Sequence, residues 1–246
     1  MFTPRSAADW RPPVVLLLGM VLLAGCGGGS GYRVSPSDLA EQYLPATRRV
    51  PHPPDTLRAV TVEEADDQLE ITLSSSYDVL HRKWSSSFQN LGTGRSPGGN
   101  PLSYATLWGR DLSVAALKAE EGLTTLTLDR ARELYEEREQ SYDEVLQIDV
   151  YWFEAEGDPL LTSPGTRAEL IVDGTRHRPT RKTHGPLQEA FLMQEGGRTL
   201  YRRNSFFFSR DVDGTELLDG ADTVELMINR GGGGQRVRFA WTWDRP

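Results

Sequence analysis

The stretch that decides the fold is "QRVRFAWTWD", residues 235–244, in which apolar and polar side chains alternate. Val237, Phe239, Trp241 and Trp243 occupy every second position of this stretch. Successive side chains of a β-strand point to opposite faces of its sheet, so a period of two is typical of a strand with one buried face. The segment therefore predicts a half-buried strand in an antiparallel sheet.

The same period extends upstream through the C-terminal half of the chain. Val224, Leu226 and Ile228 alternate in the preceding segment, and the glycines at 231–234 suit the turn of a hairpin between the two strands. Asp173-Gly174 predicts a second tight turn. Three further strand candidates are "LQIDVYWFEA" (146–155), "RAELIVDGTRHR" (167–178) and "YRRNSFFFSR" (201–210).

One long helix is predicted among these strands. Residues 128–145 carry apolar side chains mostly three and four positions apart, and Thr127 is suited to cap the helix. A β-hairpin is expected at 60–74, and a long loop at 85–100. The fold class predicted is mainly β, an antiparallel immunoglobulin-like β-sandwich with one inserted amphipathic helix at about 128–145.

The aromatic residues of the strands divide between two faces. Phe206, Phe208 and Trp152 share one face, and Phe153 and Phe207 lie on the other. We expect most of them to be core, with the helix at 128–145 covering the second face. A surface for stacking sugars is the alternative for the same rings.

The single cysteine, Cys26, follows an apolar run that begins at Val14, and Arg5 and Arg11 precede that run. The run is shorter than the roughly 20 apolar residues that a membrane-spanning helix needs. Basic, apolar and small residues in this order are typical of a secretory signal peptide that is cleaved off.

Leu23-Ala24-Gly25-Cys26 resembles the lipobox of bacterial lipoproteins. The resemblance implies cleavage before Cys26, a diacylglyceryl group on the Cys26 sulfur and, often, acylation of the new amine. Two or more acyl chains hold a protein on a bilayer lastingly. The alternative is an incidental free cysteine. Apart from this covalent lipid, we expect no cofactor.

The resemblance also implies a location in the cell envelope, anchored by lipid. Gly27, and not Asp, follows the anchor, which implies the outer membrane if the source organism is Gram-negative. The predicted domains are a cleaved signal peptide at 1–25, an anchor and Gly/Pro-rich tether at 26–56 with a short helix after Ser35, and a β-sandwich-like domain at 57–246.

A net charge of −8 argues against a nucleic-acid partner. One local exception is "RHRPTRKTH", residues 176–184. Arginine forks match phosphate and carboxylate groups, so this segment is a candidate site for lipid head groups, anionic polysaccharide or an acidic protein. A solvated loop between two strands is the alternative. The residues predicted to bind the anion are Arg176, Arg178, Arg181 and Lys182.

The patterns for catalysis and metal binding are weaker. Ser96 lies in a G-x-S-x-G match, but the prolines and glycines around it exclude the strand and helix that a nucleophile elbow needs. His177 and His184 are zinc-type ligands among repelling cations. Residues 211–214 begin like a calcium loop, but Gly220 stands where the pattern needs Glu, so a β-turn is favoured. We therefore expect no metal site.

Three functions follow in order of preference. The first is a non-catalytic, membrane-anchored envelope lipoprotein that binds another envelope protein or supports an assembly. The second is a binding module for an anionic or glycan ligand through residues 176–184. A serine hydrolase acting through Ser96 is the third, and the chain is expected not to be an enzyme.

Overall fold

The computed structural model describes residues 34–91, 102–121, 123–153, 167–194, 196–229 and 236–244. The chain is mainly β with antiparallel sheets, which confirms that part of the predicted fold class. The helices are α1 (Pro36–Ala40), α2 (Tyr77–Lys83), α3 (Arg110–Glu121) and α4 (Leu128–Glu144), with a 3₁₀ turn at Leu123–Thr125. The strands are β1 (Thr47–Arg49), β2 (Val60–Ala65), β3 (Gln68–Leu73), β4 (Ser85–Ser87), β5 (Gln89–Asn90), β6 (Tyr104–Leu107), β7 (Val145–Phe153), β8 (Arg167–Val172), β9 (Thr175–His177), β10 (Arg181–Leu192), β11 (Gly197–Ser209), β12 (Asp211–Val212), β13 (Thr215–Glu216), β14 (Thr223–Asn229) and β15 (Arg236–Thr242).

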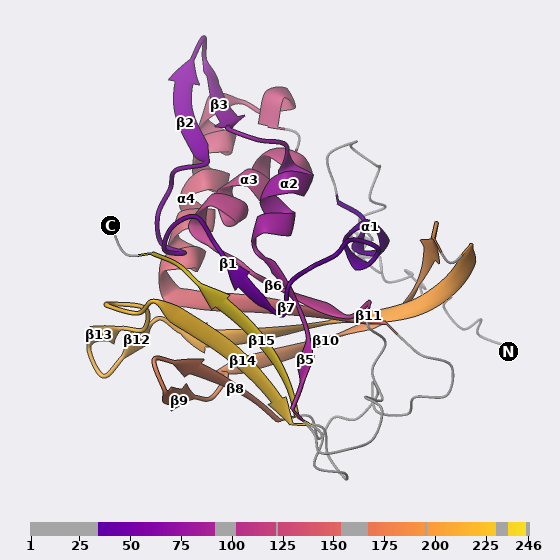
Figure 1. Cartoon of the computed structure of the whole chain (residues 1–246). Coiled ribbons are helices and arrows are strands. Elements are labelled where there is room, and N and C mark those ends of the chain that lie inside the picture. Colours follow the sequence, from indigo (N-terminus) through magenta and orange to yellow (C-terminus); the bar gives the residue numbers. More distant parts are fainter. Residues whose placement is uncertain are drawn as a thin grey trace, which may run out of the picture.

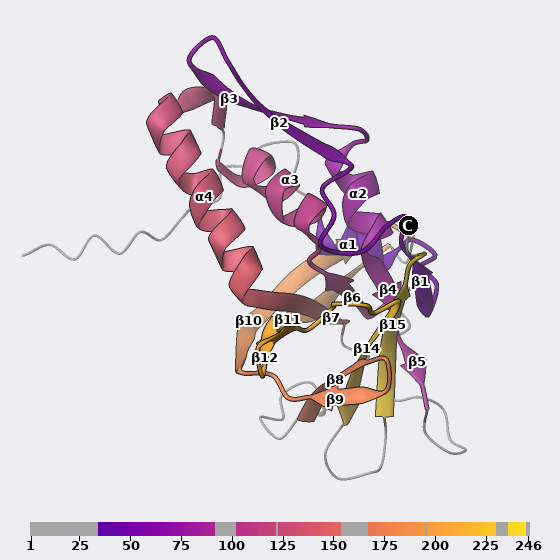
Figure 2. The same ribbon diagram turned by 90° about the vertical axis from the view of Figure 1, so that its left-hand side faces the viewer.

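Two larger sheets organise these strands (Figure 1). Sheet 1 has the order β1-β15-β14-β8-β9, with β5 also paired to β15, and sheet 2 has the order β10-β11-β7-β6-β4. Among the described strands, only the pair of β1 with β15 is parallel. Two short hairpins, β2–β3 and β12–β13, complete the strands. Figure 2 shows the helices α2, α3 and α4 gathered on one side of the two sheets.

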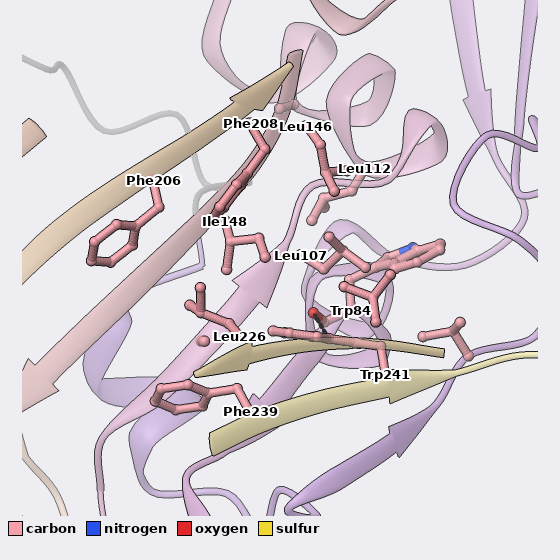
Figure 3. Close-up of a cluster of buried hydrophobic side chains, with 14 of the residues drawn as sticks. Trp84, Leu107, Leu112, Leu146, Ile148, Phe206, Phe208, Leu226, Phe239 and Trp241 are labelled. Atoms are coloured by element: carbon pink, nitrogen blue, oxygen red, sulfur yellow. Dashed lines mark hydrogen bonds between the residues drawn. The ribbon is translucent and has the colours of Figure 1, made fainter. Parts of the chain in front are cut away.

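The main core lies between the two sheets and continues into the helices (Figure 3). Phe206 and Ile148 of sheet 2 face Phe239 and Trp241 of sheet 1, and all four are fully buried. The period of two predicted from residues 235–244 places these side chains here, because it turns one face of β15 towards sheet 2. Burial of apolar area at about 25 cal/mol per Å² makes this layer the principal source of stability.

A smaller core lies on the opposite, outer face of sheet 2. Helix α1 and the loop after it place Leu39, Ala40 and Leu44 against the sheet. Ser35 caps this helix as predicted, since its hydroxyl accepts a hydrogen bond from the amide of Ser37. The aromatic residues that they cover are Tyr104, Tyr151, Phe153 and Tyr201.

The prediction that the helix at 128–145 covers Phe153 on this face is wrong. Helix α4 exists, and Thr127 caps it as predicted by accepting a hydrogen bond from the amide of Arg130. However, α4 packs on α3 and β3, while α1 covers Phe153. Phe207 is covered differently, because the guanidinium of Arg181 lies 3.9 Å from the centre of its ring.

The prediction of a single inserted helix is also wrong, because α2 and α3 accompany α4. Helix α3 buries Leu112, Val114, Ala115, Ala116 and Leu117. The buried stretch of α3 also contains Asp111 and Ser113, so its buried positions do not form a purely apolar pattern in the sequence. Helix α2 has only seven residues, too few to show a period.

The folded body begins earlier than the predicted start at Leu57. Strand β1 pairs with β15, and Val50 and His52 are buried. The proline-rich segment after them is held by Pro54, whose carbonyl accepts hydrogen bonds from the amide of Arg110 and the hydroxyl of Tyr142. Residues 34–56 therefore belong to the folded body.

The predicted loop at 85–100 is wrong for its first part. Strand β4 joins sheet 2 and β5 pairs with β15, whereas residues 92–100 lie outside the described residues. Ser85 and Ser86 are fully buried, and their hydroxyls donate hydrogen bonds to backbone carbonyls. A run of serines in the sequence instead favours an exposed loop, which is why this part was predicted wrongly. The predicted hairpin at 60–74 and the turn at Asp173-Gly174 are confirmed, the latter with positive φ at both residues.

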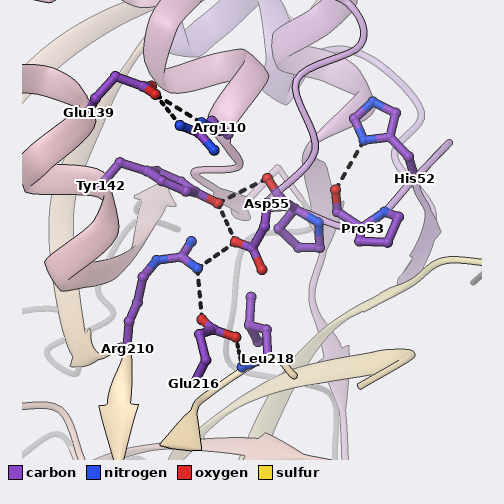
Figure 4. Close-up of polar contacts among 10 residues, drawn as sticks. His52, Pro53, Asp55, Arg110, Glu139, Tyr142, Arg210, Glu216 and Leu218 are labelled. Atoms are coloured by element: carbon purple, nitrogen blue, oxygen red, sulfur yellow. Dashed lines mark hydrogen bonds and ion pairs between the residues drawn. The ribbon is translucent and has the colours of Figure 1, made fainter. Parts of the chain in front are cut away.

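Asp55 and His52 each form an ion pair that ties the proline-rich segment to the rest, and Figure 4 shows that of Asp55 with Arg210. Arg210 is buried, binds Asp55 and Glu216, and lies 4.0 Å from the centre of the Tyr142 ring. His52 places Nε2 2.9 Å from Oδ2 of the fully buried Asp111. Burial lowers the pKa of His52, but pairing with Asp111 and the Pro53 carbonyl outweighs burial and raises it overall.

Candidate functional site

Two adjoining cavities on the outer face of sheet 2 form the candidate site. The first, of about 240 Å³, lies between that face and helices α3 and α4. The second, of about 410 Å³, lies beside the start of α1. Arg203 of β11 lines both cavities, so we call the pair the Arg203 groove.

The register of sheet 2 places the polar floor of the groove. On β7, Gln147, Asp149 and Tyr151 alternate with the core residues and therefore face outwards. Arg203 is paired with Tyr151 across the strands, on the same face. The other lining residues of the first cavity are Trp108, Ser113, Arg138, Ser141, Tyr142 and Val145, and those of the second are Val34, Ser35, Pro36, Gln188 and Tyr201.

Asp149 is the most unusual residue of this floor, because it is a carboxylate with 0% exposure in the middle of a sheet. Its Oδ2 accepts a hydrogen bond of 3.0 Å from Nε1 of Trp108, and its Oδ1 accepts one of 2.9 Å from Nε2 of Gln147. Among the described residues, no cation lies at ion-pair distance from it. A buried carboxylate is costly unless charge or hydrogen bonds compensate it. The hydrogen bonds from Trp108 and Gln147 compensate part of this cost, and Asp149 lines the first cavity.

Arg203 and Tyr151 supply the neighbouring polar groups. Burial and the charge of Asp149 raise the pKa of Tyr151 well above its ordinary value, against the opposing effect of Arg203 and its hydrogen bond. The phenol stays protonated at neutral pH. The groove thus combines an arginine, a neutral phenol and a carboxylate, a set that suits a ligand with an anionic group and hydroxyl donors.

A buried network lies beside Asp149, on the neighbouring strands of sheet 2. Nε2 of His81 lies 3.2 Å from Oγ1 of Thr106, and Oγ of Ser85 lies 2.9 Å from the same atom. Thr106 is the cross-strand neighbour of Asp149. Ser85 and Thr106 also have 0% exposure but, unlike Asp149, they line neither cavity of the groove.

The structure distributes the predicted anion-binding residues over both sheets. Arg176 of β9 pairs with Glu169 at 3.0 Å, and Arg178 is exposed in the connection to β10. Arg181 stacks on Phe207, whereas Lys182 is the next residue of the strand and so points to the other face. None of the four lines either cavity of the Arg203 groove, and their binding of anions stays a prediction.

The other predicted site residues are separated or lie outside the described residues. His177 belongs to sheet 1, and His184, with Nδ1 3.2 Å from Oδ1 of Asn204, belongs to sheet 2. Residues 211–214 form the expected β-turn, in which the amide of Gly214 donates to Asp211. Within the part of the chain that the structure describes, no three His, Cys, Asp or Glu side chains gather as metal ligands do. Cys26 and Ser96 fall outside that part.

Sequence reasoning missed Asp149, Trp108 and Arg203. A usable signal was present for Asp149, because it is a charge inside an apolar strand, in phase with Tyr151 and Phe153. Trp108 and Arg203 carry no local signal, since they reach the groove only through the pairing of β6 and β11 with β7.

No helix in the described ranges is both long and apolar enough to span a bilayer. A scan of known protein families finds no family model that matches this chain. A search of curated proteins likewise finds no match to it. What the chain does is therefore argued from its own residues.

Proposed function

We propose that this protein is a lipid-anchored lipoprotein of the cell envelope that acts by binding and not by catalysis, its partner being another envelope protein or an assembly. The observation that carries the proposal is the Leu23-Ala24-Gly25-Cys26 sequence at the end of an apolar run. The position of Val34 supports it, because this first described residue lies only eight positions after Cys26 and already packs on both cores. If the source is Gram-negative, the anchor lies in the outer membrane.

The architecture supports a binding role. We propose that the fold is an immunoglobulin-like β-sandwich, and the two sheets that share one core support this. Strand β10 forms one edge of sheet 2 and β9 one edge of sheet 1. Unpaired strand edges offer backbone groups to an added strand of a partner.

The first test compares the wild type with Cys26→Ser in bacteria that lipidate proteins. We expect radiolabelled palmitate to enter the wild type only, and the variant to leave the membrane fraction, because two or more acyl chains provide the lasting attachment. Crosslinking followed by mass spectrometry should identify an envelope protein with the wild type. Equal labelling of both chains would contradict the anchor, and failure to crosslink any envelope protein would contradict the partner.

A second candidate function is recognition of an anionic or glycan ligand, here in the Arg203 groove. The buried Asp149, which has hydrogen-bond donors but no ion pair among the described residues, favours it. Trp108 and Tyr142 add aromatic surface to the same cavity. An anionic sugar would place its carboxylate on Arg203 and its hydroxyl donors on Asp149.

Calorimetry with glucuronate and glucose tests this candidate. We expect glucuronate to bind more tightly, and Arg203→Gln to weaken its binding by roughly 10- to 100-fold, the loss typical of a hydrogen bond to a charged group. Arg198→Gln is the matched control, since Arg198 lies on the same strand but outside the groove. Equal affinity for both sugars, or equal losses in both variants, would contradict the assignment.

A further inference from the structure

The exposed apolar side chains of this protein gather at one end. Among the described residues, six large apolar side chains are exposed, and two of them, Val79 and Leu91, lie elsewhere. The other four lie on the β10–β11 hairpin or next to α1, the helix packed on that hairpin. Figure 1 shows this hairpin extending away from the stacked sheets, with α1 beside it. We call these four residues the apolar end: Tyr43, Leu187, Phe191 and Met193.

The alternation of β10 explains why the apolar end stays uncovered. Leu192 points to the outer face and is buried against α1. Leu187 and Phe191 point to the other face, where they are 42% and 55% exposed. That face is core only farther along the hairpin, where Phe206 and Phe208 meet sheet 1. On this side of the hairpin Leu187 and Phe191 are exposed beside Glu189 and their cross-strand neighbours Arg202 and Arg198, and nothing in the described residues covers the two apolar side chains.

Met193 and Tyr43 extend this surface around the tip. The amide of Gln194 donates to Oε1 of Glu41 at 3.0 Å, and its side-chain amide donates to the Glu41 carbonyl at 3.1 Å. These bonds hold the tip against the end of α1. Met193 precedes Gln194 and is 76% exposed, and Tyr43 follows Glu41 by two positions and is 86% exposed.

Apolar surface costs about 25 cal/mol for each Å² left in water, and exposed apolar patches mark protein or membrane contacts. We infer that the apolar end contacts the lipid bilayer that holds the acyl chains of Cys26. This inference rests on the proposed lipid anchor. The short length of chain between Cys26 and Val34 is a second argument for this contact.

Val34 lies eight positions after Cys26, so the chain between them spans at most about 28 Å when fully extended. Val34 lines the second cavity together with Gln188, and β10 runs from Gln188 to Leu192 for only about 13 Å. The bilayer surface and the apolar end therefore lie within reach of one another whenever the anchor is inserted. An exposed tyrosine together with exposed Leu, Phe and Met side chains suits the interface of a bilayer.

Charge contributes little to this contact. Arg198, the cross-strand neighbour of Phe191, forms an ion pair of 3.5 Å with Glu189. The contact is apolar, so we expect it to persist at high salt, unlike the attachment of a basic patch to anionic lipids.

The single cysteine makes a direct test available. The thioether on Cys26 blocks its sulfur, so in Phe191→Cys or Met193→Cys the introduced thiol is the only free one. Each lipidated full-length variant is labelled with an environment-sensitive fluorophore and placed in vesicles of phosphatidylethanolamine and phosphatidylglycerol. We expect a blue shift on adding vesicles and a severalfold loss of quenching by a water-soluble quencher, both unchanged in high salt.

Val79→Cys is the matched control, because Val79 is exposed and apolar but lies on α2. The fluorophore at position 79 should remain accessible to the water-soluble quencher when vesicles are added. Equal quenching at 79, 191 and 193 would overturn the inference, as would protection at 191 in detergent without vesicles, which would show a protein cover such as a second copy. Labelling of the parent protein at Cys26 would instead refute the lipid anchor, so the two failures are distinguishable.

Discussion

Replacing Trp241 with alanine is expected to lower the free energy of unfolding by about 3–5 kcal/mol, the range observed for buried aromatic residues. Trp241 has 0% exposure and lies between the two sheets, where its indole Nε1 donates a hydrogen bond of 3.0 Å to the carbonyl of Trp84. Truncation leaves a cavity and removes one of two hydrogen bonds to that carbonyl, which also accepts one of 3.0 Å from the amide of Leu107. Chemical denaturation followed by circular dichroism measures the change.

Two further variants make this prediction specific. Trp241→Phe keeps most of the apolar volume but loses the hydrogen bond, so its loss should be smaller than that of the alanine variant. Phe191→Ala removes an aromatic side chain that is 55% exposed, and a change within about 0.5 kcal/mol is typical of surface positions. If Trp241→Ala were as mild as Phe191→Ala, the packing of the two sheets described for this protein would be wrong.

Acidification from about pH 6.5 to pH 4 is expected to remove about 3 kcal/mol of stability through His81 alone, at 1.36 kcal/mol per pKa unit. Burial lowers the pKa of His81 to about 4 in the folded protein. The unfolded chain takes up a proton as the pH falls through about 6.5, while the folded protein keeps His81 neutral. A depressed folded pKa thus gives stability that is present above the unfolded value and is lost as the pH falls.

Denaturation curves recorded between pH 7 and pH 4.5 test this. His81→Asn should flatten the dependence of the unfolding free energy on pH in this window, because it removes the titrating group next to Thr106. His184→Asn, at an exposed histidine, is the control that should keep the slope. The contribution of His52 to stability has the opposite dependence on pH. Its pKa is raised in the folded protein, so it adds stability at low pH that is lost as the pH rises through the folded pKa. The same slope in the wild type and in His81→Asn would mean that His81 reaches solvent in the folded state.

Local chemistry was sufficient to predict several elements. The period of two located β7, β14 and β15, because each strand turns one face to the core and the other towards a more polar surface. Cap residues located α1 and α4, because a hydroxyl before the first turn satisfies an amide that has no partner within the helix. These signals depend on neighbours within a few positions of the chain.

The elements that failed depend on distant neighbours. Helix α3 buries Asp111, which accepts hydrogen bonds from the distant amides of Arg58 and Ala59. Strand β4 is a run of serines that becomes a strand only by pairing with β6. The proline-rich segment looked like a tether, but the contacts of Pro54 with Arg110 and Tyr142 draw it into the body. A local pattern contains no information about such partners.

The sequence by itself determined that the fold is mainly β and which strands carry the core, because periodicity and helix caps are local properties of the chain. The anchor predicted at Cys26 also comes from a local property, the resemblance to a lipobox. Only the tertiary structure decided where the candidate sites lie. Strand register pairs Arg203 with Tyr151, so that Arg203 and Asp149 line one cavity, and Leu187 and Phe191 of the β10–β11 hairpin stay exposed. Both depend on pairing between segments far apart in the chain, which is decided by packing of the whole molecule rather than by any one stretch.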